Sequence, residues 1–233
     1  MIIYYGIECP INIGLRFESP HPVKIYEEFS QDEQTHNFNL CPAYAAHNKN
    51  LFYVPALFDY NLWYDKENNV YQTSYYDQEV FNNFIRGRVL RLKLLSFNMY
   101  VHILTESDNL ELSQLPAYLH PNQFTRNSVI IPGTFNIGKW PRPLDVAFYL
   151  LDKIEIKEGE PLYYIKFNTK ESINFKRFIV TERYKKYTND IILASRKLER
   201  PKIKKLSYFY NLINNAPKLK IMMLEEAKSN LLE

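Results

Sequence analysis

The chain of 233 residues has little of the glycine that many enzyme sites require. It contains six glycines, and none of them falls in a GxGxxG or GxxxxGK(S/T) motif. Nucleotide-binding α/β folds need such glycines because their backbone must approach the phosphates closely. The sequence therefore argues against a nucleotide-binding α/β fold.

Cysteine and long apolar runs are also scarce. Cys9 and Cys41 are the two cysteines, and neither belongs to a CxxC motif. They are too few for a disulfide framework, so we expect free thiols in a reducing compartment, with one bridge left open. Cys41 has no cation near it in the sequence, so we expect it to be a small buried hydrophobe.

No run approaches the roughly 18 apolar residues of a membrane span, and the first residues lack a basic segment. We expect a soluble cytoplasmic protein without membrane contact.

Aromatic residues are abundant, with nineteen tyrosines and fifteen phenylalanines. Residues 129–169 show how they are used, because this stretch reads as alternating strands and turns. A strand should end at Pro132 and Gly133, an almost uncharged strand covered on both faces should span 144–151, and two strands should flank a tight turn at Gly159. Between them we expect a solvent-facing loop at 134–143 that carries three candidate contact residues: Lys139, Trp140 and Arg142.

The rest of the chain up to residue 180 continues in short strands separated by turn residues. We expect strands near 2–5, 11–17, 51–55, 57–64, 70–74, 89–95 and 98–104. Such regular spacing is typical of an antiparallel β-sandwich or a jelly-roll-like body. The predicted fold is mainly β, α+β overall, with this body at 1–180 and a basic helical appendage at 181–233.

The appendage differs from the body in charge and in periodicity. Net charge is −5 through residue 152, +10 over 153–220 and −2 over the last thirteen residues. Thr181 can cap a first helix and Pro217 can open a last one. The tail exposes too much apolar surface to stay alone in water, so we expect it to pack on the sheets or on a neighbouring subunit.

Cations and aromatics interleave at 183–187 (RYKKY), which suits phosphate contact together with base stacking. The alternative is a solvated cationic face with the tyrosines packed inward. The candidate contact residues of the tail are Arg183, Lys185, Lys186, Lys202, Lys204 and Lys205.

The five histidines form no HxH, HxxxH or HExxH motif. A metal site would therefore have to assemble from distant strands. Its candidate ligands are His47, Asp59, His102 and His120. The alternative for His102 is a half-exposed position on its strand. Because no motif is complete, we expect no resident cofactor.

Three short features lie within residues 40–167: Cys41-Pro42, the pair Pro55 and Asp59, and the turn at Gly159 and Pro161. In these features the chain resembles a family of uncharacterised β-rich proteins of cyanophages and some bacteria. Asn136 and Gly138 stand where that family has acidic residues, which counts against a carboxylate site there. The resemblance implies a viral setting, in the host cytoplasm or the virion, and brings no activity.

These features favour a phage-type accessory or virion-associated structural protein that forms homo-oligomers or contacts other viral proteins, without catalysis. Two alternatives stay open. One is a jelly-roll enzyme that depends on a metal or a nucleotide. The other is nucleic-acid binding through the basic tail.

Overall fold

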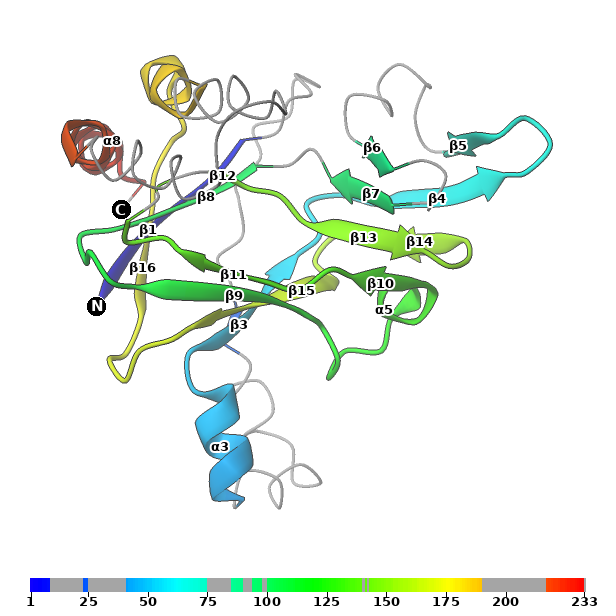
Figure 1. Ribbon diagram of the computed structural model, residues 1–233, viewed down its shortest axis with the longest axis horizontal. Helices are drawn as coiled ribbons and strands as arrows, with labels where there is room; N and C mark the ends of the chain where they lie inside the picture. Colours follow the sequence, from blue (N-terminus) through cyan, green and yellow to red (C-terminus); the bar gives the residue numbers. More distant parts are fainter. Residues whose placement is uncertain are drawn as a thin grey trace, which may run out of the picture.

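The structure is a computed structural model that describes residues 1–8, 23–24, 41–74, 85–89, 94–97, 100–139, 141, 143–189 and 217–232. Over these residues the protein is mainly β, with several antiparallel sheets and a C-terminal helix (Figure 1). The predicted fold class is confirmed. The predicted strand at 11–17, Cys9, Trp140, Arg142, Lys202, Lys204 and Lys205 lie outside the described residues.

The largest sheet has the order β11-β9-β15-β3-β2 and is antiparallel throughout. Its strands are β11 (Gly133–Asn136), β9 (Glu111–Pro116), β15 (Pro161–Phe167), β3 (Leu51–Pro55) and β2 (Val23–Lys24). The central strand β15 is buried on both faces, because Tyr163 and Ile165 enter the main core while Tyr164 packs with Leu51 and Ala117 on the other side. Apolar residues at consecutive positions of this strand fit burial on both faces.

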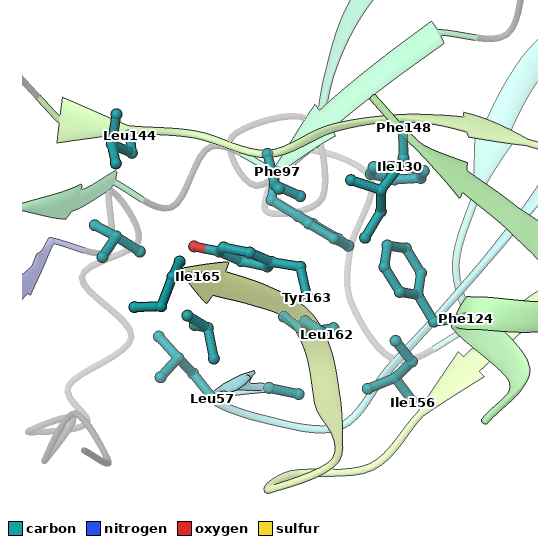
Figure 2. Packing of buried hydrophobic residues seen from close by; sticks show 14 of the residues in the cluster. Leu57, Phe97, Phe124, Ile130, Leu144, Phe148, Ile156, Leu162, Tyr163 and Ile165 are labelled. Carbon is teal, nitrogen blue, oxygen red and sulfur yellow. The ribbon is translucent and has the colours of Figure 1, made fainter. Parts of the chain in front are cut away.

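Two further sheets close the main core. One has the order β10-β13-β7-β6, from β10 (Ser128–Ile130), β13 (Ala147–Leu150), β7 (Leu94–Phe97) and β6 (Ile85–Val89). The other has the order β14-β4-β5, from β14 (Ile154–Ile156), β4 (Tyr60–Asp65) and β5 (Val70–Gln72). Figure 2 shows Phe97, Phe148 and Phe124, the last from α5 (Gln123–Asn127), lying close to one another in this core. Their ring centroids are 4.8 to 5.6 Å apart, the spacing of favourable aromatic pairs.

The fourth sheet, of order β12-β8-β1-β16, carries the tail. Its strands are β12 (Pro143–Leu144), β8 (Tyr100–Thr105), β1 (Ile2–Glu8) and β16 (Asn174–Arg177), and β16 runs parallel to β1. Residues 182–189 form a helix that Thr181 caps through its hydroxyl, which accepts the N–H of Tyr184 at 3.1 Å. The last helix is α8 (Pro217–Ser229), drawn in red beside β1 in Figure 1. Both predicted helix starts are therefore confirmed.

The tail packs on the chain's own body. One buried cluster joins Tyr4 of β1 and Leu104 of β8 to Tyr184 and Met223 of the two tail helices. A β-bridge between Phe178 and Leu231 lies beside it. The expectation that the tail needs apolar cover is thus met within one chain, for the part of the tail that the structure describes.

Several local expectations differ from the structure. The strands that flank Gly159 exist, and Gly159 has φ of +84°, but β14 pairs with β4 while β15 pairs with β3 and β9, so the two strands do not form a hairpin. The predicted strand at 144–151 is divided into β12 and β13, because the carbonyl of Val146 accepts the N–H of Phe97 and the chain passes from one sheet to another. The helix α3 (Pro42–Asn48), α5 and strand β9 were missed.

The predicted loop at 134–143 is partly a strand. Residues 133–136 form β11 because their backbone pairs with the edge of β9. Only the turn that follows β11 is irregular. Within the described residues, no helix has the length and apolar character needed to cross a membrane.

Candidate functional site

Two of the four candidate metal ligands, His47 and His120, lie in one group of polar rings at the outer side of β15. His47 of α3 contacts the hydroxyl of Tyr118, with Nε2 and Oη 2.6 Å apart. The rings of Tyr118 and Tyr164 pack edge to face at 5.0 Å, and the hydroxyl of Tyr164 lies 2.6 Å from Nδ1 of His120. With Lys166 of β15, whose Nζ is 3.5 Å from Nδ1 of His47, these residues are called here the His47 cluster.

Tyr164 and His120, the inner half of the His47 cluster, stabilise the fold. Tyr164 is fully buried and accepts the backbone N–H of Leu119 at 3.0 Å, so its own hydroxyl hydrogen can be donated to Nδ1 of His120. The ring of His120 also packs edge to face against Tyr53, at 5.2 Å. Buried tyrosine hydroxyls generally require such a partner, and His120 supplies it.

His47, Tyr118 and Lys166, the outer half of the His47 cluster, lie where solvent can reach them. Tyr118 is 48% exposed and the side of α3 that carries His47 faces solvent. Partial burial and the positive charge of Lys166 hold the pKa of His47 below its usual value. Burial raises the pKa of Tyr118. A neutral histidine beside a lysine and a protonated tyrosine offers hydrogen-bond donors at the surface.

The other two candidate ligands lie elsewhere. Asp59 accepts the N–H of Glu158 at 2.8 Å and an N–H of Lys157 at 3.3 Å, which fastens the Gly159 turn to the start of β4 and lowers the pKa of Asp59. His102 of β8 lies beneath the tail, with its ring perpendicular to that of Tyr184 at 5.1 Å. Among the described residues, no group of three or more histidine, cysteine or acidic side chains could hold a metal ion.

The predicted half-exposed position of His102 is wrong, because His102 is 1% exposed. The helix at 182–189 covers the face of β8 that alternation alone leaves open. The expected burial of Cys41 is wrong too, because Cys41 precedes α3 at its exposed N-terminal end and is a free, exposed thiol.

Two of the candidate tail cations, Arg183 and Lys185, are engaged by their own chain. Arg183 donates from Nε to the hydroxyl of Tyr187 at 2.8 Å and lies 3.6 Å from Oε2 of Glu226, while Lys185 pairs with Glu182 at 2.7 Å. Tyr184 and Tyr187 are 1% and 8% exposed. The interleaved tyrosines therefore pack inward and are not available for base stacking, although Lys186 is exposed. Nucleic-acid binding by these cations stays a prediction that now depends on phosphate contact alone.

Lys139 lies at the exposed end of the turn after β11. The side chain of Asn136 accepts the N–H of Lys139 at 2.9 Å, and Gly138 packs against the backbone of residues 107–109. A β-carbon on Gly138 would lie 2.6 Å from the carbonyl carbon of Asp108. Asn136 and Gly138 thus have a structural role in this turn.

The sequence did not reveal an exposed apolar surface on β10 and β13, which is a better candidate for protein contact than the tail cations. Val129 of β10 and Tyr149 of β13 are partners across the strand pair and therefore share a face. Ile131 and Leu151 continue this face, because Ile131 bonds to the carbonyl of Ala147 and Leu151 to that of Asn127. Val129, Ile131 and Leu151 are 47%, 37% and 61% exposed. These four residues are called here the β10–β13 face.

The β10–β13 face is apolar on the side where a sheet is usually polar. Ile130, Phe148 and Leu150 alternate with it and are buried in the main core. An antiparallel sheet with one solvated face normally alternates apolar and polar residues. The almost uncharged pattern at 144–151 predicted cover on both faces, but Ala147 and Tyr149 on the outer face of β13 are only partly buried.

Comparison of the sequence with protein-family models gives no match, and comparison with curated proteins finds no relative. The physical features above therefore carry the functional argument.

Proposed function

We propose that the protein is an accessory structural protein that self-associates through the β10–β13 face, without catalysing a reaction. The observation that carries this proposal is the exposed apolar face of β10 and β13, opposite a fully buried one. The phage or virion setting rests on the resemblance over residues 40–167 and belongs to the same proposal.

A second copy of the chain is the partner that this face fits. The face carries no charge, so its best complement is an equally apolar surface, and a two-fold axis would place the same four residues against themselves. At its border Asp152 and Lys153 follow Leu151, and both are exposed. In a two-fold arrangement these opposite charges can pair across the border, which gives the contact a polar rim.

Light scattering coupled to size exclusion tests the proposal over a range of protein concentrations. We expect the wild type to run as a dimer or a larger closed oligomer, and Leu151→Glu and Val129→Glu to run as monomers. A carboxylate there would be buried against an apolar surface without a partner. Val70→Glu is the matched control, because Val70 is 42% exposed on β5, outside the face, and should leave the oligomer intact.

A wild type that stays monomeric at high concentration would end the proposal, as would equal effects of Leu151→Glu and Val70→Glu. Circular dichroism should show the native spectrum for each variant, so that loss of assembly is separated from loss of folding. Removal of the tail would be a poorer test, because it would uncover Tyr4 and Leu104 in the body.

A further inference from the structure

In the outer half of the His47 cluster, the donor and acceptor role of each polar atom follows from the ammonium group of Lys166. The ammonium group of Lys166 can only donate, so Nδ1 of His47 accepts from it and the ring proton sits on Nε2. That Nε2–H is then donated to the hydroxyl oxygen of Tyr118 at 2.6 Å. The hydroxyl hydrogen of Tyr118 must therefore point away from His47. Lys166 and Tyr118 each keep hydrogen atoms that His47 does not accept. A second proton on His47 would go to Nδ1, so Lys166 would then turn its donors from Nδ1 to an anion.

Among the residues that the structure describes, no carboxylate balances the charge of the cluster. The lowered pKa of His47 has two causes, burial and the charge of Lys166, whereas a nearby carboxylate would act in the opposite direction. No carboxylate of the described residues forms an ion pair with Lys166. The hydroxyl of Tyr44 on α3 also acts on Tyr118 and raises its pKa further. A lysine beside an exposed histidine, with no carboxylate of the described residues paired to it, is an arrangement that an anion would stabilise.

We propose that Lys166, His47 and Tyr118 bind a phosphate group. Lys166 would supply the charge, Tyr118 a neutral hydroxyl donor, and His47 a second cation once the anion is present. Charge-assisted hydrogen bonds of this kind are among the stronger polar contacts in proteins. The site is independent of the β10–β13 face, so it goes beyond the proposed self-association.

The experiment is a titration of the full-length protein with inorganic phosphate near pH 6.5, followed by NMR of the histidine ring protons. Each histidine has its own signal, so His120 serves as an internal reference in the same molecule. We expect the His47 signal to move in a saturable way, and its titration midpoint to rise when phosphate is bound, because the anion favours the protonated ring. Sodium chloride at equal ionic strength controls for screening, and acetate tests whether a single-charged carboxylate suffices.

Three variants make the test specific. Lys166→Met keeps the length of the side chain and should weaken phosphate binding by about tenfold or more, as expected for loss of a charged donor. Tyr118→Phe should weaken it by a smaller factor and keep the dependence on Lys166. Lys176→Met, in β16 of another sheet, should bind phosphate like the wild type.

Binding by the wild type that Lys166→Met retains would overturn the proposal, and so would a His47 signal that phosphate moves no more than chloride does. Equal movement of His120 and His47 would also overturn it, because that pattern indicates general screening. Thermal melts of each variant show whether a weak binder is still folded. Tyr118→Phe provides a second test if Lys166→Met fails to fold.

Discussion

Truncation of Met223 to alanine tests whether the helical tail stabilises the β-sheet body. Met223 of α8 is fully buried in the cluster with Tyr4, Leu104 and Tyr184, whereas its neighbour Met222 is 39% exposed. Methionine and alanine are both good helix formers, so neither substitution should unwind α8 by itself. The two variants differ only in the contacts that they remove.

The expected magnitudes differ clearly. Loss of a fully buried methionine side chain typically costs about 2–5 kcal/mol, because transfer energy and cavity formation add. A substitution at an exposed position usually changes the free energy of unfolding by less than about 0.5 kcal/mol. For a chain of this length, a loss of about 3 kcal/mol corresponds to a fall in Tm of roughly 6–12 °C.

The assay is urea unfolding monitored by two signals, helical circular dichroism for the tail and tryptophan fluorescence for the body. Trp63 lies in β4, in a different sheet from the one that carries the tail. We expect Met223→Ala to shift both transitions to lower urea, and Met222→Ala to shift neither. A Met223→Ala variant whose fluorescence transition coincides with that of the wild type would show that the tail does not stabilise the body.

Three further predictions concern turns, two of them the turn at residues 106–109, which α8 contacts. Hydrogen bonds from Lys228 and Tyr4 hold the pKa of Glu106 below its ordinary value of 4.5, so the contribution of Glu106 to stability is present above pH 4.5 and is lost as the pH falls through its lower folded pKa. Thermal melts should therefore show a smaller acid-induced fall in Tm for Glu106→Gln than for the wild type, and parallel curves would contradict this. Gly138→Ala should cost about 1–3 kcal/mol, because its β-carbon would lie 2.7 Å from the carbonyl oxygen of Ser107. Gly159→Ala should cost about 1–2 kcal/mol for a different reason, its positive φ, so Gly159→Asn should regain part of the loss in chemical denaturation and Gly138→Asn should regain none.

Much of the fold could be read from alternation, because each strand buries one or both faces in a fixed two-residue period. This is why β3, β5, β10, β14 and β15 were predicted close to their positions. Pairing could not be read in the same way. The Gly159 turn looks like a hairpin turn, yet β14 pairs with β4, and β15 pairs with β3 and β9, strands that lie much earlier in the chain. Local sequence specifies a strand and a turn, but the partner is chosen by how the whole core fits together.

The candidate site shows the same limit. His47 was singled out, but Tyr118 and Lys166 carry no motif, and they meet His47 only because α3 is placed beside β15. His102 was misread because a strand face looks exposed until a helix 80 residues later covers it. Residues that meet only in the folded structure form no motif of fixed spacing in the sequence.

Two lysines of α8 are paired with acidic residues of the body. Lys220 pairs with Asp108 at 2.9 Å and donates to the carbonyl of Ser107 at 3.0 Å, and Lys228 pairs with Glu106 at 2.6 Å. The acidic body and the cationic tail therefore complement each other where α8 meets the turn after β8. Pairs with at least one exposed partner add little stability singly, yet these two together help to fix the position of α8 on the sheet. A positive segment in a sequence indicates an acidic partner, and for α8 that partner includes an earlier part of the same chain.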